Sequence, residues 1–361
     1  MDQSKCFEGL KVVELANVLA GPAVGMFFAE LGAEVIKIEN KTTGGDMTRK
    51  WKLPEEDKDS PISAYYCSVN WNKEVKLLNL KEKKDQAIVH DLIRESDIVI
   101  TNYKPGKSEE LKMDYHTLKN INPGLIYAHI SGFGEDSTRT AFDVVLQAET
   151  GFMSMNGQPD GPPTKMPVAL IDILAAHQLK EGILVGLIQR LKTGKGSYIS
   201  ASLFDSTIAS LANQATNWLM AKHNPTRLGS IHPNIAPYGE IIETIDNQQV
   251  VLAIGTDKQF KALCKIIGRD ELAKNKDFST NGNRVINRKK LHIELIKSMK
   301  LFSADSLLSN LIKNDVPCGI INTISDVFNS PAATKTVLKE VIETVPTSRV
   351  KTVAFTIKTD F

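Results

Sequence analysis

The chain has 361 residues, of which 42% are hydrophobic and 24% charged, a balance that excludes a disordered protein and suffices for about two domains. Lys and Arg number 44 and Asp and Glu 42, so the net charge of +2 argues against a general nucleic-acid or membrane surface. No apolar run reaches the roughly 18 residues of a membrane span.

Strands and helices are predicted to alternate through the first 150 residues. Short apolar runs predict buried strands at 10–15, 34–39, 75–80, 98–103 and 124–134, and helices are predicted at 21–33 and 84–97. Strands separated by helices form a parallel sheet with helices on both faces. Ligands bind beyond the carboxyl ends of such strands, so we expect the loops that follow the strands to carry the site.

The second half of the chain changes character at residue 222. A long helix is predicted from Ile171 to the turn KTGKG, followed by a strand at 198–205 and a helix at 206–221. HNPTRLGSIHPNIAPYGE has several Pro and Gly residues and no periodicity, which predicts a linker or an active-site loop. IIETIDNQQVVLAIG predicts a hairpin, and helices follow at 260–267, 288–301 and 306–313. We predict a large domain over 1–205, a linker over 206–224 and a small domain over 225–327.

Several common site motifs are missing. After the first strand, NVLAGPAVG has only Gly21 and Gly25, which disfavours a dinucleotide-binding loop. PGKSEE contains GKS, but Thr101 stands where a P-loop needs glycine. Neither GxSxG nor HExxH occurs, and isolated histidines are more often structural than metal ligands.

The cysteines and the N-terminus indicate the compartment. Cys6, Cys67, Cys264 and Cys318 are widely spaced and form no CxxC pair, so we expect neither a zinc site nor a disulfide framework. MDQSKCFEGL resembles neither a signal peptide nor an Arg-rich presequence. A cytoplasmic protein is expected, or a mitochondrial-matrix protein in a eukaryote.

One carboxylate stands out. Asp172 lies where the apolar run of DGPPTKMPVALIDILAAHQLKEGI becomes a helix. An Asp there can be a plain helix N-cap, which is the more frequent role. It can also be a covalent nucleophile at the edge of an α/β sheet. With an ordinary pKa near 4 it would be ionised at pH 7 without a base.

At this point the residues resemble a known family. LKVVELANVLAGPAVGMFFAELGAEVIKIE is similar to the start of class III CoA-transferases (CaiB/BaiF type), which include formyl-CoA, carnitine and succinate–hydroxymethylglutarate CoA-transferases. The resemblance continues in order through GGDMTRKW, YYCSVNWNKEVKLLNL, TNYKPG, IYAHISGFG, FDVVLQAETGFMSMNG, the Asp172 segment, LKTGKGSYISASLFD, HPNIAPYGE, NRVINRKKL and DVPCGIINTISDVF. It covers nearly the whole chain.

The resemblance implies an α/β fold: a large domain with a Rossmann-like parallel sheet, a smaller α+β domain, and an interlocked-ring homodimer. Residues 328–361 would return to the large domain. Relatives extend beyond the equivalent of TVAFTIKTDF, so either a naturally short or a truncated member of the family is expected.

The resemblance also implies a mechanism. Asp172 would attack the acyl-CoA carbonyl to give a mixed anhydride, and the CoA thiolate would then convert this to an aspartyl-CoA thioester. An acceptor acid would reverse the steps. Coenzyme A would be a co-substrate, with no other cofactor, no metal, and no nucleic-acid or membrane partner.

Other matched positions imply contacts with CoA. One loop would pack against CoA and direct backbone N–H groups at the reacting carbonyl, where losing a donor typically costs about 3 kcal/mol; it comprises Val18, Leu19 and Ala20. Contacts with the nucleotide and pantetheine are implied for Lys73, Asn102, Tyr103 and Arg139, although Lys73 could be a plain surface lysine.

The resemblance places four residues around the acid substrate. Arg49 and Trp51 would line the entrance, Asp143 would orient the site, and His232 would approach a second carboxylate. Asn40 and Glu110 replace arginines that lie near the CoA phosphates in the formyl-CoA type. The nearby basic residues that could substitute are Lys41, Lys104 and Lys107.

Two alternative functions stay open. A related α-methylacyl-CoA racemase needs an acid/base pair, and its histidine position is Phe142 here, which cannot exchange a proton. A non-catalytic CoA-binding homologue is the other alternative. For a transferase, the expected substrates are succinyl-CoA or a similar donor and a small dicarboxylic acid such as oxalate, glutarate or itaconate.

Overall fold

The computed structural model describes residues 5–358, which form two compact units. The larger unit contains the chain up to Phe152, Lys165–Asn224 and the chain from Lys335 onward; the smaller contains Met153–Thr164 and Pro225–Thr334. Residues 206–224, predicted as a linker, therefore belong to the larger unit. The single helix predicted at 206–221 is two helices, and the second one begins at Ala212, whose φ is 47°.

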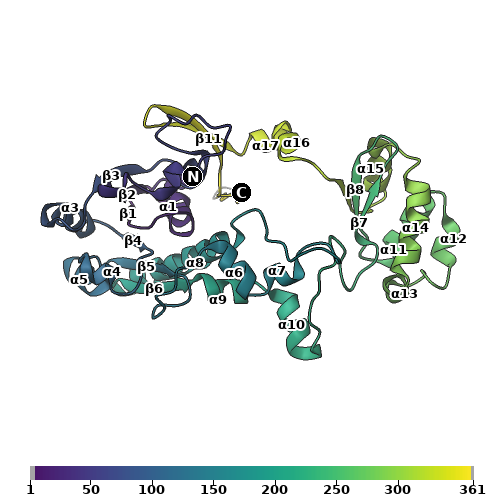
Figure 1. The fold of residues 1–361 in the computed structure, drawn as a ribbon, viewed down its shortest axis with the longest axis horizontal. Coiled ribbons are helices and arrows are strands. Elements are labelled where there is room, and N and C mark those ends of the chain that lie inside the picture. Colours follow the sequence, from purple (N-terminus) through teal and green to yellow (C-terminus); the bar gives the residue numbers. More distant parts are fainter. Residues whose placement is uncertain (1–4, 359–361) are drawn as a thin grey trace. The chain divides into compact units, whose positions relative to one another are not determined.

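A six-stranded parallel sheet forms the centre of the larger unit, in the order β3–β2–β1–β4–β5–β6 (Figure 1). This confirms the predicted α/β class. The strands are β1 (Lys11–Glu14), β2 (Glu34–Asn40), β3 (Glu74–Leu78), β4 (Ile98–Thr101), β5 (Ile126–Ser131) and β6 (Ser197–Ser202). The strand order reverses between β1 and β4, so the loops after these two strands flank the crevice where ligands of such sheets bind.

Helices cover both faces of this sheet because strand side chains alternate between the faces. Val12 and Ile100 belong to one core and Val13 and Val99 to another. The first core is shared with α1 (Ala20–Glu30) and α8 (Leu170–Thr193), the second with α3 (Lys83–Arg94) and α5 (Tyr115–Ile121). Shorter elements of this unit are η2 (Lys41–Thr43), η3 (Met47–Lys50), α2 (Ala64–Cys67), α4 (Lys107–Glu110), α6 (Asp143–Glu149), α9 (Leu203–Ala209) and α10 (Ala212–Ala221).

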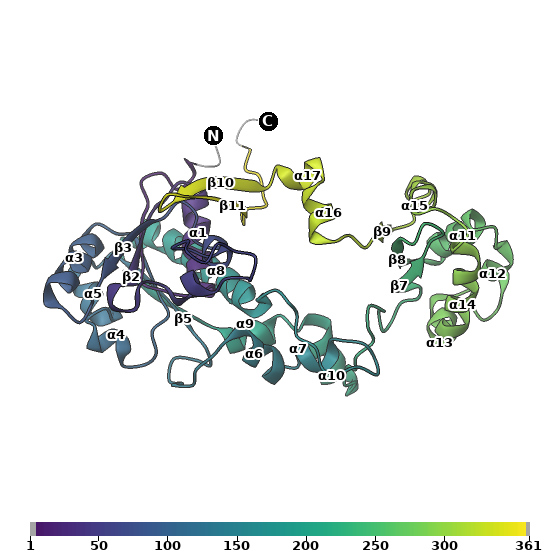
Figure 2. The same ribbon diagram turned by 45° about the horizontal axis from the view of Figure 1, so that its top comes forward.

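The C-terminal hairpin lies against the N-terminal half of the same unit (Figure 2). Glu30 accepts hydrogen bonds from the N–H groups of Thr352 (2.9 Å) and Val353 (2.8 Å) and forms an ion pair with Arg349. These contacts hold the segment after the hairpin on α1. The hairpin strands are β10 (Val337–Ile342) and β11 (Val345–Val350), which pair antiparallel.

The smaller unit has its own hydrophobic core and a three-stranded antiparallel sheet in the order β7–β8–β9. The predicted hairpin is confirmed as β7 and β8, and helices plus this sheet make the unit α+β. Its elements are β7 (Tyr238–Glu243), β8 (Gln249–Ala253), α11 (Asp257–Ile266), α12 (Asp270–Lys274), α13 (Asn281–Ile286), α14 (Arg288–Met299), α15 (Ala304–Lys313), β9 (Cys318–Ile320), α16 (Ile324–Phe328) and α17 (Pro331–Thr334), while α7 (Phe152–Met155) lies at the boundary between the units. Within residues 5–358 we find no helix with the length and apolarity that crossing a membrane requires.

Candidate active site

A narrow cavity of about 150 Å³ opens where the strand order reverses. The loop after β1, the loop after β4, the end of β5 and the start of α8 all contribute to its wall. Seven of the residues predicted for the site line it: Val18, Leu19, Ala20, Asn102, Tyr103, Arg139 and Asp172. The fold therefore brings together segments that are far apart in the sequence.

Asn102 joins the two loops that flank this crevice. Its Oδ1 accepts a hydrogen bond from the Asn17 N–H (3.2 Å), and its Nδ2 donates to the Asn17 carbonyl oxygen (2.9 Å). A side-chain amide that pairs with both backbone groups of one residue fixes the spacing of the two loops. Asn102 thus holds the cavity wall in place, and Tyr103 beside it adds an aromatic residue to the lining of the cavity.

Asp172 is buried, with 9% of its surface exposed, and lies in the first turn of α8. It is not the helix cap. Ala169 occupies the N-cap position, and the N–H of Ile171 donates to Oδ2 of Asp143 (2.7 Å), which belongs to α6. Within residues 5–358 we find no donor hydrogen-bonded to the Asp172 carboxylate. This side chain is therefore left facing the cavity without a structural partner.

Burial also changes the acidity of Asp172. Burial, together with the negative charge of Asp143, raises the pKa of this carboxyl to about 7. The expectation of an ordinary pKa near 4 is therefore wrong, because the sequence does not report burial. With this pKa, Asp172 becomes fully ionised only above neutral pH.

Trp51 contacts a tyrosine, Tyr65, that is affected by the same charges. Its ring packs edge-on against Tyr65, with 5.0 Å between ring centroids. Burial, together with the charges of Asp172, Asp143 and Asp46, raises the pKa of Tyr65 to about 12. Trp51 is 39% exposed and lines neither cavity, so its place at the entrance of the site stays a prediction.

A second cavity, of about 630 Å³, shares Asn17 and Tyr103 with the first. It lies along the carboxyl ends of β1, β2 and β3 and is lined by two basic residues, Lys81 and Lys107. Lys81 was not among the predicted site residues. Its signal in the sequence is its place just after a predicted strand, at the edge of the sheet where ligands bind.

Lys73 does not line either cavity. Its Nζ is fully buried and donates to Glu14 Oε2 (2.7 Å), the Pro22 carbonyl oxygen (2.8 Å) and Asn70 Oδ1 (3.1 Å). Lys73 precedes β3 whereas Lys81 follows it, so only Lys81 reaches the carboxyl edge of the sheet. This placement does not support the predicted contact between Lys73 and the nucleotide.

Arg49 likewise points into the protein rather than into the entrance of the site. Its guanidinium is 6% exposed and binds Glu39 (2.6 Å), the Tyr66 hydroxyl (2.8 Å) and Glu343 (3.0 Å) of the C-terminal hairpin. Glu343 lies in the turn between β10 and β11. Arg49 therefore ties the hairpin to the sheet.

The remaining predicted residues are divided between the two units. Arg139 pairs with Glu149 (2.7 Å), and its guanidinium lies 3.9 Å from the centroid of the Phe133 ring. His232 belongs to the smaller unit, where its backbone N–H donates to the Tyr238 carbonyl oxygen (2.8 Å). Its role toward the acid substrate stays a prediction. Among residues 5–358 no group of three or more His, Cys, Asp or Glu side chains is arranged to hold a metal ion.

The lysines predicted to replace missing arginines differ in their placement. Lys104 lines the narrow cavity and its Nζ donates to Thr140 Oγ1 (2.6 Å), whereas Lys107 lines the wide one. Lys41 instead pairs with Asp85 (3.1 Å) outside both cavities. Lys81, Lys104 and Lys107 are thus the basic groups that surround the two cavities, together with Arg139.

Known proteins resemble this chain over nearly its whole length. The model of CoA-transferase family III matches residues 7–361. The succinate–glutarate CoA-transferase of Agrobacterium fabrum is 38% identical over 90% of this chain and 82% of its own length, and the human succinyl-CoA:glutarate CoA-transferase is 36% identical over 92% and 75%. The crystal structure of a CAIB/BAIF family protein from Brucella suis superposes with a TM-score of 0.84 at 39% identity, covering 97% of this chain and 92% of that one.

Proposed function

Because this chain belongs to CoA-transferase family III, we propose that it moves CoA from succinyl-CoA, or a similar acyl-CoA, to a small dicarboxylic acid by way of Asp172. The observation that carries this proposal is a buried carboxylate that faces a cavity and has no hydrogen-bond donor within residues 5–358. Relatives 33–38% identical to this chain are named for succinate or succinyl-CoA with glutarate or mesaconate, which supports the choice of dicarboxylic acids.

The covalent steps of CoA transfer all involve the side-chain carboxylate of Asp172. The ionised Asp172 carboxylate attacks the thioester carbonyl carbon, the C–S bond breaks, and the CoA thiolate leaves a mixed anhydride behind. The thiolate then attacks the Asp172 acyl carbon and releases the donor acid. The acceptor carboxylate attacks the resulting aspartyl thioester, the C–S bond breaks, and the CoA thiolate leaves a second mixed anhydride. Attack of the thiolate on the acceptor's acyl carbon then forms the new acyl-CoA and releases the Asp172 carboxylate.

The negative charge that develops on the thioester oxygen needs hydrogen-bond donors beside Asp172. Val18 cannot provide one, because its N–H donates to Asp46 Oδ2 (3.1 Å). Leu19 is the N-cap residue of α1 and Ala20 is its first residue, where N–H groups have no acceptor within the helix, and both line the cavity with Asp172. We assign these two N–H groups to the developing oxyanion.

The two cavities differ in volume in the same sense as the two parts of CoA. The narrow cavity, which contains Asp172, suits the thin pantetheine arm and the thioester, and Tyr103 marks where it meets the wide cavity. The wide cavity suits the adenosine end, with Lys81 and Lys107 close to the phosphates.

Replacing Lys81 tests this arrangement. Lys81→Ala is expected to raise the KM for succinyl-CoA by about tenfold, because one charge-assisted contact with phosphate is lost. The KM for the dicarboxylic acid should stay unchanged. Lys83→Ala is the matched control, since Lys83 is exposed and lies outside both cavities. Equal effects of the two variants would remove Lys81 from the CoA site.

The pH dependence of transfer tests the role of Asp143. Transfer needs ionised Asp172, so the rate should fall as the pH drops through about 7. Asp143→Asn removes a neighbouring negative charge, which lowers the pKa of Asp172 and moves the acid limb of kcat/KM to lower pH by about one unit. The Asn oxygen can still accept the Ile171 N–H, so α8 keeps its cap. An acid limb that does not move would contradict this coupling.

Trapping the acyl-enzyme tests the proposed function directly. The protein is incubated with succinyl-CoA alone, treated with hydroxylamine and digested, and the peptide that contains Asp172 is weighed. A hydroxamate on Asp172 is the expected product, since both the anhydride and the thioester react with hydroxylamine. Turnover with glutarate while Asp172 stays unmodified would refute the mechanism.

The same preparation separates the alternatives. Exchange of the α-hydrogen of a methyl-branched acyl-CoA would indicate the racemase. In this chain Phe142, which lines the narrow cavity, stands at the position of the histidine that accepts the proton in the racemase. Binding of CoA without transfer or exchange would indicate a non-catalytic homologue. The homodimer stays a prediction, which sedimentation velocity would test.

A further inference from the structure

The loop between β1 and α1 has a strained backbone at Val18. Its φ is 74°, in the left-handed region that β-branched residues rarely adopt. Such a conformation persists only where the surrounding structure holds it. Val18 lines the narrow cavity with Asp172, and the two residues that follow it carry the N–H groups assigned above to the oxyanion.

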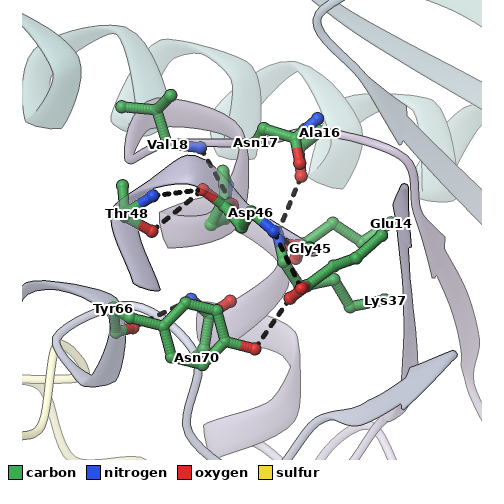
Figure 3. Close-up of polar contacts among 12 residues, drawn as sticks. Glu14, Ala16, Asn17, Val18, Lys37, Gly45, Asp46, Thr48, Tyr66 and Asn70 are labelled. Carbon is green, nitrogen blue, oxygen red and sulfur yellow. Dashed lines mark hydrogen bonds and ion pairs between the residues drawn. The ribbon is translucent and has the colours of Figure 1, made fainter. Parts of the chain in front are cut away.

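Asp46 holds this backbone from below the loop (Figure 3). Its Oδ2 accepts the hydrogen bond from the Val18 N–H (3.1 Å), while its Oδ1 accepts from the N–H (3.0 Å) and Oγ1 (2.9 Å) of Thr48. The side chain of Asp46 is fully buried, and the residue is 2% exposed. One carboxylate therefore joins the strained residue to the start of η3.

Lys37 supports both Asp46 and the loop. Its Nζ is fully buried, lies 3.2 Å from Asp46 Oδ2, and donates to the Ala16 carbonyl oxygen (2.8 Å) and to Glu14 Oε1 (2.8 Å). The lysine thus holds the residue two positions before Val18 and the carboxylate that binds Val18 (Figure 3). Gly25 makes room for this group, because a Cβ there would lie 1.9 Å from Glu14 Oε2.

Burying these charges is costly unless every partner is present, and a hydrophobic core of the same volume is often as stable. Stability alone therefore does not account for placing them directly under the catalytic loop. We infer that Asp46, backed by Lys37, is a positioning residue that holds Val18 in its left-handed conformation and so aims the N–H groups of Leu19 and Ala20 at the thioester. This inference rests on the proposed function.

Asp46→Asn tests the inference with a nearly isosteric change. The amide has a single acceptor oxygen, so it can serve Thr48 or Val18 but not both, and it no longer balances Lys37. The kcat for CoA transfer, calculated per Asp172 that hydroxylamine can trap, should fall about tenfold or more. The reason is that the N–H groups of Leu19 and Ala20 no longer reach the oxyanion. The Kd for free CoA, measured by calorimetry, should change little, since CoA itself has no thioester oxygen.

Thr48→Val is the matched control. It removes a hydrogen bond to the other oxygen of Asp46 but keeps the carboxylate, its ion pair with Lys37 and the bond from Val18. Its kcat should equal that of the parent protein. An Asp46→Asn protein that loses thermal stability but keeps the parent kcat would show that Asp46 is only structural, and would overturn the inference.

A double variant isolates the strain at Val18. Glycine adopts a φ of 74° without a steric penalty, so in a Val18→Gly background the loop depends less on Asp46. Asp46→Asn should therefore lower kcat by a smaller factor in that background than in the parent. Equal factors in the two backgrounds would contradict the positioning role.

Hydroxylamine trapping separates this inference from the proposed function. If the parent protein gives no Asp172 hydroxamate, the proposed function fails. If the parent and Asp46→Asn proteins form the hydroxamate at equal rates, the proposed function stands and the positioning role fails. Formation of the same product, but at least about tenfold more slowly in Asp46→Asn, is the expected result.

Discussion

Asp172→Asn is expected to lower the rate of CoA transfer by about four orders of magnitude or more, because the neutral amide cannot form the anhydride. The assay follows glutaryl-CoA formed from succinyl-CoA and glutarate by chromatography. Glu181→Gln is a matched control, since Glu181 is an exposed carboxylate on the same helix, and its rate should equal that of the parent. Full activity of Asp172→Asn would end the proposal.

The same variant is expected to make the folded protein more stable at alkaline pH. Burial raises the pKa of Asp172 from 3.8 to about 7, so the folded state favours the protonated carboxyl. The contribution of the protonated Asp172 carboxyl to the free energy of unfolding is fully present below the pKa of the unfolded state. It is lost as the pH rises through about 7. At pH 8 the cost of the buried charge is on the order of 4 kcal/mol, which the amide avoids.

Denaturant titrations at pH 5 and pH 8 measure this effect. The gain in the free energy of unfolding of Asp172→Asn over the parent should be larger at pH 8 than at pH 5. A gain that does not depend on pH would show that the Asp172 carboxyl is not held at a raised pKa. An inactive but stabilised variant would also show that the loss of transfer is not caused by unfolding.

Lys37→Met is expected to cost about 3–5 kcal/mol of folding free energy, because it leaves buried charges without a partner. Glu14 Oε1, Asp46 Oδ2 and the Ala16 carbonyl oxygen each lie within 3.2 Å of the Lys37 Nζ. Methionine has a similar length but neither charge nor donor. The shift of the unfolding midpoint in urea, followed by circular dichroism, measures the loss.

Lys11→Met is the matched control for Lys37→Met. Lys11 lies on β1, the strand next to that of Lys37, and pairs with Glu95 (2.7 Å), but its side chain is 41% exposed. Exposed ion pairs contribute little, so this variant should leave the unfolding midpoint close to that of the parent. Equal losses from both variants would mean that burial of Lys37 has no special energetic role.

Local patterns in the sequence were sufficient for the sheet and for the position of Asp172. Short apolar runs separated by helices predicted five strands that the structure confirms as β1 to β5, and a sixth confirmed as β6. Such patterns reflect alternating burial along a few residues, which is a short-range property. The junction at which Asp172 begins its helix was recognisable for the same reason.

Predictions about individual side chains were less successful where long-range packing decides. Lys73 and Arg49 were expected near the ligand, yet both form buried ion pairs with carboxylates on other strands. A lysine that points into the core and one that points into a cavity have the same local sequence signature. Lys81 was missed because only the folded sheet, with all its strands in place, shows which loops share a cavity.

The amino-acid sequence by itself determined the parallel α/β sheet, the hairpin of the smaller unit and the identity of the carboxylate at the start of α8. Only the tertiary structure decided that this carboxylate is buried beside Asp143 and that the Val18 N–H is bound by Asp46. The physical reason is that acidity and hydrogen bonding depend on which distant groups exclude water or approach within about 3 Å, and folding alone brings those groups together.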